Sequence, residues 1–120
     1  MRTVQTLATL LIFASLSAFA AEPCQTIRGR AIYYSADGQL RLWHIGTHHE
    51  FDPPGPDVDP SDSWQPIIQR LRQGSGTDTE AFDRNALVGD FVVCPTEPYR
   101  KSAVQPAIIR SMSNLRVVPR

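Results

Sequence analysis

The sequence is poor in the features that usually disclose an activity. Its 120 residues include two cysteines and one lysine, and its formal net charge is zero. It contains no Walker loop, no G-x-G-x-x-G, no G-x-S-x-G and no H-E-x-x-H. A near-neutral chain also has no charge-driven reason to bind nucleic acid or an anionic membrane. No motif therefore points to nucleotide-dependent, serine-hydrolase or zinc-protease chemistry.

The longest apolar stretch lies at the start of the chain. Arg2 supplies a positive charge, residues 7–16 are apolar, and residues 18–20 read Ala-Phe-Ala, an A-x-A cleavage site. This pattern predicts a secretory signal peptide over residues 1–20 and a single small domain over residues 21–120. The stretch is too short for a membrane span. We therefore expect a periplasmic or secreted protein with no stable membrane insertion after cleavage.

Both cysteines, Cys24 and Cys94, remain after this cleavage. In an exported protein an isolated pair predicts one disulfide, which here closes a loop of about 70 residues. Such a bridge contributes about 4 kcal/mol in the chain-entropy model. The alternative is a reactive thiol pair, but the C-x-x-C spacing typical of redox chemistry is missing.

The first half of the domain predicts a β-hairpin over residues 27–35 and 39–46. Its Asp-Gly pair at residues 37–38 suits a two-residue type I′ turn. Opposed glycines at the far end predict a sharp bend in the ribbon. The expected cross-strand pairs are Ser35–Leu40, Tyr33–Leu42, Ala31–His44 and Gly29–Gly46 on one face, and Tyr34–Arg41, Ile32–Trp43 and Arg30–Ile45 on the other.

A loop and a helix are predicted next. Four prolines and four aspartates favour an extended loop over residues 51–63. Asp62 or Ser63 can cap the helix that follows, and Gly74 can end it, before a flexible link over residues 73–79. The helix is indicated by apolar residues at i, i+3, i+4 and i+7, namely Trp64, Ile67, Ile68 and Leu71.

Three further strands are predicted over residues 87–94, 104–110 and 115–118, with a polar turn at 111–114. Pro106 should demote its strand to an edge or a bulge. The order of elements predicts a mainly β domain, a small five-stranded OB-like barrel with one short α-helix. A further short strand within residues 47–51 would improve this match.

Three sequence blocks carry a resemblance. They are Gly29-Arg30, Arg41-Leu42-Trp43-x-x-Gly46-Thr47-His48 and Gly89-Asp90-Phe91-Val92-Val93-Cys94-Pro95. Together they resemble a group of small exported bacterial proteins of uncharacterised function, over residues 29–118. The resemblance implies a periplasmic OB-like domain and supplies no catalytic residues.

Candidate binding residues gather on one face of the predicted hairpin. Aromatic rings interleaved with guanidinium groups can stack on sugars or planar groups while binding carboxylates or phosphates. The residues of this face are Arg30, Ile32, Tyr34, Arg41 and Trp43. The alternative is that the helix covers Trp43 and Ile32. A second candidate patch, Tyr99 and Arg100 with Lys101, lies in the loop after Pro95.

The histidines form a third cluster. His44 and His48 share a face of an extended strand, with Glu50 close by, and two imidazoles plus a carboxylate can hold Zn²⁺. The spacing matches no usual zinc signature, so a solvated strand end, with His44 packed beside Ala31, is the favoured reading. His44, His48 and Glu50 stay as alternative metal ligands, and no cofactor is expected.

The function expected from these features is a non-catalytic periplasmic binding module for an envelope protein or glycan. Its ligand-binding residues would be Arg30, Tyr34, Arg41, Trp43, Tyr99 and Arg100. Nucleic acid is not an expected partner. Two alternatives remain open: a metal-dependent enzyme centred on His44 and His48, and a purely structural or stress-related envelope protein.

Overall fold

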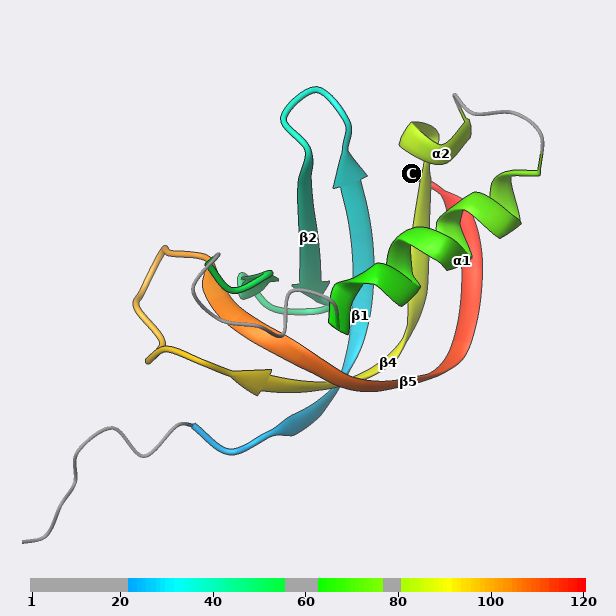
Figure 1. Ribbon diagram of the computed structural model, residues 1–120. Helices are drawn as coiled ribbons and strands as arrows, with labels where there is room; N and C mark the ends of the chain where they lie inside the picture. Colours follow the sequence, from blue (N-terminus) through cyan, green and yellow to red (C-terminus); the bar gives the residue numbers. More distant parts are fainter. Residues whose placement is uncertain (1–21, 56–62, 77–80) are drawn as a thin grey trace, which may run out of the picture.

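The computed structural model describes residues 22–55, 63–76 and 81–120, so the predicted signal peptide lies outside it. The described chain is mainly β (Figure 1). Helix α1 (Gln65–Ser75) and the single turn α2 (Ala81–Arg84) separate the third strand from the fourth. The strands are β1 (Gln25–Tyr34), β2 (Gln39–His44), β3 (Glu50–Asp52), β4 (Asn85–Pro95) and β5 (Gln105–Pro119).

The five strands form one sheet whose order closes on itself. The order of hydrogen-bonded neighbours is β1-β2-β3-β5-β4, and β1 also pairs with β4. All neighbours are antiparallel except β3 and β5, which are parallel. The prediction of a mainly β domain with five strands and a helix between the early hairpin and the later strands is confirmed.

The hairpin forms, but its predicted register is wrong by two residues. Tyr34 pairs with Gln39, because the loop between the strands has four residues and not two. The Asp37 amide donates to the Tyr34 carbonyl (3.3 Å), and only Gly38 of the Asp-Gly pair has a positive φ (64°), which rules out a type I′ turn. Because the shift is an even number, every side chain keeps its predicted face.

Gly29 does not lie opposite Gly46. It lies opposite His44 on β2 and Gly89 on β4. A Cβ at this position would come within 2.6 Å of Leu42 Cδ1 and 2.9 Å of a Phe91 ring carbon. Glycine is therefore required here by close packing of the core against the backbone.

Two further expectations about strands are corrected. The predicted loop over residues 51–63 begins later, because Phe51 and Asp52 belong to β3; Phe51 is fully buried opposite Leu42. Residues 56–62 of that loop lie outside the described ranges. The polar segment 111–114 is not a turn but part of β5, which pairs with β4 through two register shifts. Such irregularities bend a strand without ending it.

The apolar stripe of α1 is confirmed, but the predicted Ser63 cap and the predicted end at Gly74 are wrong. Trp64, Ile67 and Leu71 are fully buried. The helix begins after Trp64, with no side-chain cap from Ser63, and it ends at Gly76, whose φ is 64°. Gly74 belongs to the last turn instead, so the predicted link over residues 73–79 starts too early. The other cap candidate, Asp62, lies outside the described residues.

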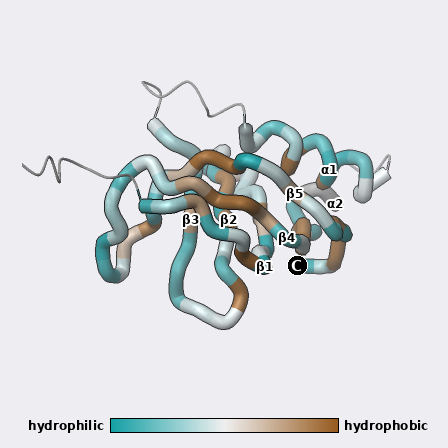
Figure 2. The backbone as a smooth tube through the Cα atoms, turned by 90° about the horizontal axis from the view of Figure 1, so that it is seen from below, coloured by the Kyte–Doolittle hydropathy of each residue, from teal (hydrophilic) through white to brown (hydrophobic). Residues whose placement is uncertain are grey.

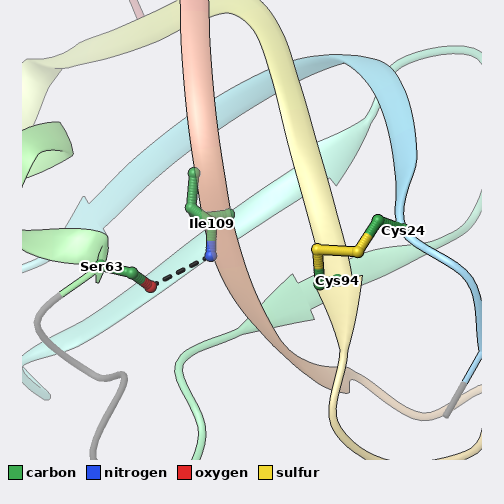
Figure 3. The surroundings of a disulfide bond; sticks show 4 residues. All are labelled: Cys24, Ser63, Cys94 and Ile109. Atoms are coloured by element: carbon green, nitrogen blue, oxygen red, sulfur yellow. Dashed lines mark hydrogen bonds between the residues drawn. A yellow bond between two sulfur atoms is a disulfide. The ribbon is translucent and has the colours of Figure 1, made fainter.

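The start of α1 completes an open edge of β5. Just beyond the pairing with β3, the Ile109 amide donates to Ser63 Oγ (3.0 Å; Figure 3), and the Trp64 indole N–H donates to the Ala107 carbonyl (2.8 Å). Two backbone groups that no neighbouring strand reaches are thereby satisfied. This explains why Ser63 is bonded to the sheet and does not cap the helix.

The hydrophobic core lies between α1 and the inner face of the sheet. Figure 2 shows hydrophobic segments along β4 and β5 in the middle of the molecule and hydrophilic colours on the connecting loops. Helix α1 packs mainly on β4 and β5. The core residues include Ile27, Ala31, Leu42, Phe51, Trp64, Ile67, Leu71, Leu87, Phe91, Val93 and Ala107. The outer face of β1 and β2 therefore stays outside the helix-covered core.

Candidate functional site

The predicted disulfide is confirmed. Cys24, just before β1, is bonded to Cys94 near the end of β4 (Figure 3). The two cysteines are 70 residues apart in the sequence, and neither is left as a free thiol. The bond therefore ties the beginning of the described chain to the strand that precedes the Tyr99 loop (residues 96–104).

A polar network that the sequence did not reveal lies beside this bond. Gln105 is a buried polar residue, and its amide nitrogen donates to Glu22 Oε2 (3.1 Å) and to the Glu97 carbonyl (2.9 Å). Its amide oxygen is 2.8 Å from His49 Nε2. The other oxygen of Glu22 accepts from the Tyr99 amide (2.8 Å). This Gln105 network fixes the Tyr99 loop to the segment before β1 and to the chain just before β3.

The network makes a prediction about acid stability. Hydrogen bonds from the Tyr99 amide and the Gln105 side chain hold the pKa of Glu22 below its ordinary value of 4.5. The folded state therefore gains stability from ionised Glu22 above pH 4.5, and this gain is lost as the pH falls through the lower folded pKa. We expect Glu22→Gln to flatten the fall in melting temperature between about pH 5 and pH 3. Thermal unfolding followed by circular dichroism across that range measures it.

Asp52 supplies the control with the opposite sign. Burial raises its pKa above 3.8, opposed by the charge of Arg41, so ionising Asp52 costs stability as the pH rises through the folded pKa. Asp52→Asn should therefore make the melting temperature fall more steeply as the pH is lowered, whereas Glu22→Gln should make it fall less steeply. If the melting temperatures of the wild type and of Glu22→Gln fall equally with decreasing pH, the assigned role of Glu22 is contradicted.

The two predicted binding patches are separate in the structure. Tyr99 contacts the His49 ring edge-on, with 4.7 Å between centroids, and it is 47% exposed. Arg100 lies on the same loop and lines a small hollow of about 160 Å³ with Glu97 and Pro98. The structure thus places Tyr99 and Arg100 around the Gln105 network and not on the hairpin face.

The hairpin face is brought together as predicted, and α1 does not cover it. Arg30 lies directly opposite Trp43 on the outer face of β1 and β2, and Ile32 lies opposite Arg41. Neither Trp43 nor Ile32 belongs to the core cluster, which the helix residues do join. The alternative in which the helix buries Trp43 and Ile32 is therefore wrong.

Within this face, the side chains from β1 already contact the end of the chain. The Arg30 guanidinium donates to the Pro119 carbonyl (3.1 Å). The Arg120 guanidinium lies over the Tyr34 ring, 4.6 Å from its centroid. Both contacts join the hairpin to the end of β5. The β1 side of the face therefore contacts Pro119 and Arg120, whereas Trp43 on β2 has no such contact among the described residues.

Arg41 faces an acidic partner on β3. Its guanidinium is 3.7 Å from Asp52 Oδ2 and donates to Gln39 Oε1 (2.8 Å). The other Asp52 oxygen is buried without a hydrogen-bond partner. Both Arg41 and Asp52 line a hollow of about 200 Å³ at the start of β2, next to Gly38 and Pro53. The pair therefore gives the β2–β3 face a mixed charge and not a purely basic one.

Trp43 forms the wall of a second hollow on this face. The hollow measures about 360 Å³ and is lined by Trp43, Thr47, His48 and Glu50. Glu50 lies directly opposite Trp43 across β2 and β3. The sequence had singled out Trp43 for a ligand and Glu50 and His48 for a metal. The structure joins these three residues in one place.

The histidines are dispersed by the fold. His44 lies opposite Gly29, and Ala31 is paired with Leu42, so the expected packing of His44 beside Ala31 is wrong. His49 belongs to the Gln105 network, whereas His48 lines the Trp43 hollow. Within residues 22–55, 63–76 and 81–120, no three or more His, Cys, Asp or Glu side chains are grouped so that they could hold a metal ion.

Comparisons with protein-family models, with curated proteins and with solved structures gave no match. Among the described residues, no helix has the length and apolar character needed to cross a bilayer. The candidate site is therefore the outer face of β2 and β3, which carries Trp43, Glu50 and the Arg41–Asp52 pair.

Proposed function

We propose that the chain is a non-catalytic binding module of the cell envelope, with an OB-like barrel that holds a protein or glycan partner on the outer face of β2 and β3. The strand order, the parallel β3–β5 pair and the helix between β3 and β4 support the OB-like assignment. In OB folds the face of the second and third strands commonly binds ligands. Because a fold carries no function by itself, the proposal rests on the residues of that face.

The observation that carries the proposal is the partly buried indole of Trp43 on a sheet face that α1 does not cover. Arg41 lies two residues away on the same strand and Glu50 lies opposite on β3. Aromatic side chains surrounded by polar groups are enriched at binding surfaces, because they bury a large area at low entropic cost. This combination favours contact with a partner over a purely structural role.

Two features support an envelope location. The Cys24–Cys94 disulfide is the kind of bond that persists in oxidising compartments. Residues 1–20 have the pattern of a signal peptide.

A pull-down experiment tests the proposal. Residues 21–120, immobilised with the disulfide intact, are expected to retain one defined protein or glycan from an envelope extract. Arg41→Ala/Trp43→Ala should lose it, because both substitutions remove side chains from the β2 face without touching the core. Mass spectrometry and glycan analysis of the eluate identify the partner.

The matched control is Tyr99→Ala/Arg100→Ala, which removes an aromatic ring and a guanidinium from the separate loop. It should retain the partner if the β2–β3 face binds. Capture that survives Arg41→Ala/Trp43→Ala but not the control variant would move the site to the Tyr99 loop. Equal capture by all variants would refute both faces.

A further inference from the structure

We infer that the hollow beside Trp43 binds one pyranose ring of an envelope glycan. The inference rests on the proposed binding function and deepens it, because it names the ligand chemistry. Its parts are an open aromatic face, two polar groups at the rim and a rigid loop behind them: Trp43, Glu50, His48 and the turn over residues 44–49. At about 360 Å³ the hollow falls in the range of about 300–1,000 Å³ that small-molecule sites occupy.

The indole is held in one orientation before any ligand arrives. Its N–H donates to the Thr47 carbonyl (2.7 Å). The Thr47 amide and hydroxyl both bond to the His44 carbonyl (3.1 and 2.7 Å), and the same hydroxyl accepts from the His49 amide (3.0 Å). Because the turn is closed on itself in this way, the ring loses little freedom when a ligand stacks on it.

The rim offers two hydrogen-bonding side chains, Glu50 and His48, that are not bonded to any of the described residues. The N–H of Trp43 and the hydroxyl of Thr47 are both used inside the turn. Both oxygens of an ionised Glu50 carboxylate can accept hydrogen bonds, and the His48 imidazole can donate or accept. A pyranose ring matches this pattern, since its C–H face is apolar and its edge carries adjacent hydroxyls.

Charge favours neither of the two other ligands that an aromatic wall commonly takes. Trp43 lies between Arg30 on β1 and Glu50 on β3, so an organic cation or a phosphate group would each meet one like charge beside one opposite charge. An uncharged polyhydroxylated ring meets no such repulsion.

The two tryptophans make a direct optical assay possible. Trp64 is 1% exposed and its N–H is bonded inside the protein, so a ligand added from solution reports on Trp43. The full exported domain is titrated separately with the tetramers of N-acetylglucosamine, glucose in β-1,4 linkage and glucose in α-1,4 linkage. Each is raised to about 10 mM, which detects a Kd as weak as about 1 mM. At least one tetramer is expected to shift the indole emission saturably and to protect it from acrylamide quenching.

The same tetramer is then titrated into variants while amide chemical shifts are recorded, which checks folding at the same time. Trp43→Ala and Glu50→Gln should each weaken binding by about tenfold or more, because the first removes the stacking face and the second replaces a charged acceptor oxygen by a neutral donor amide. Arg100→Ala, which removes a charged side chain from the separate Tyr99 loop, should leave the affinity unchanged. The shifts should centre on Thr47, His48 and Glu50.

Two results would overturn the inference. One is that no tetramer protects Trp43. The other is that Glu50→Gln binds as tightly as the wild type. If the envelope pull-down still captures a protein that depends on Arg41 and Trp43, the binding module stands and only the sugar assignment falls. If that capture also fails, the proposed function falls with it.

Discussion

Replacing both Cys24 and Cys94 by serine is expected to lower the free energy of unfolding by about 4 kcal/mol. The bond closes a loop between residues 70 apart, and it therefore restricts the unfolded chain strongly. Since about 1 kcal/mol shifts the melting temperature of a domain this size by about 4–8 °C, the variant should melt at least about 15 °C lower. Urea unfolding of the oxidised wild type and the double variant measures the difference.

The same substitution should loosen the Gln105 network. Glu22 lies two residues before Cys24, and its carboxylate bonds to the Tyr99 amide and to the Gln105 side chain. Without the disulfide, the segment before β1 is attached to the Tyr99 loop only through the hydrogen bonds of Glu22. The Tyr99 amide should therefore exchange with solvent faster in the variant, under conditions in which the core remains folded.

Reduced wild-type protein is the matched control, because it lacks the bond without any change of sequence. It should show the same loss of stability as the double serine variant. A double variant as stable as the oxidised wild type would contradict the entropic argument. Slow exchange at Tyr99 in a destabilised variant would contradict the coupling to the network.

The elements that were correctly predicted have local causes. The stripe from Trp64 to Leu71 has helical spacing, and all the information for it lies within eight residues of sequence. The hairpin face was also predicted, since alternation in a strand fixes which side chains share a face. The register failed because it depends on loop geometry. A four-residue loop and a two-residue loop keep the same alternation and differ only in partners.

The elements that were missed, or raised only as an option like the short strand within residues 47–51, depend on distant partners. Residues 50–52 form a strand only because β2 and β5 lie on either side, and the following prolines conceal it. Residues 111–114 are polar because that stretch of β5 lies outside the core; Ser111, Ser113 and Asn114 are exposed. Polarity alone does not distinguish a bent outer strand from a turn.

The candidate site was predicted in part for the same reason. Trp43 and Arg41 were visible on one strand, but their β3 neighbours were assigned elsewhere, Asp52 to a loop and Glu50 to a metal cluster. The Gln105 network could not be predicted, because Glu22 and Gln105 are 83 residues apart. A lone buried glutamine has no sequence signature. Only the pairing of β3 with β5 brings His49 beside it.

Trp64→Ala is expected to lower the free energy of unfolding by about 3–5 kcal/mol, the usual effect of truncating a large buried aromatic residue. Trp64 is the largest fully buried side chain, and it fills the space between α1 and the sheet. Its removal leaves a cavity and takes away the hydrogen bond to the Ala107 carbonyl. Urea unfolding followed by far-ultraviolet circular dichroism measures the loss.

Comparison with Trp43 separates burial from hydrogen bonding, because both indoles donate to a backbone carbonyl at nearly the same distance, 2.8 Å for Trp64 and 2.7 Å for Trp43. Trp64→Phe keeps most of the apolar volume but leaves a buried carbonyl without its donor, which should cost about 1–3 kcal/mol. Trp43→Phe exposes its carbonyl to water and should cost less than about 1 kcal/mol. Equal losses at the two positions would show that burial of the Trp64 hydrogen bond to the Ala107 carbonyl adds no stability. Unequal losses in the expected order would show that Trp64 contributes much more to the stability of the fold than Trp43 does.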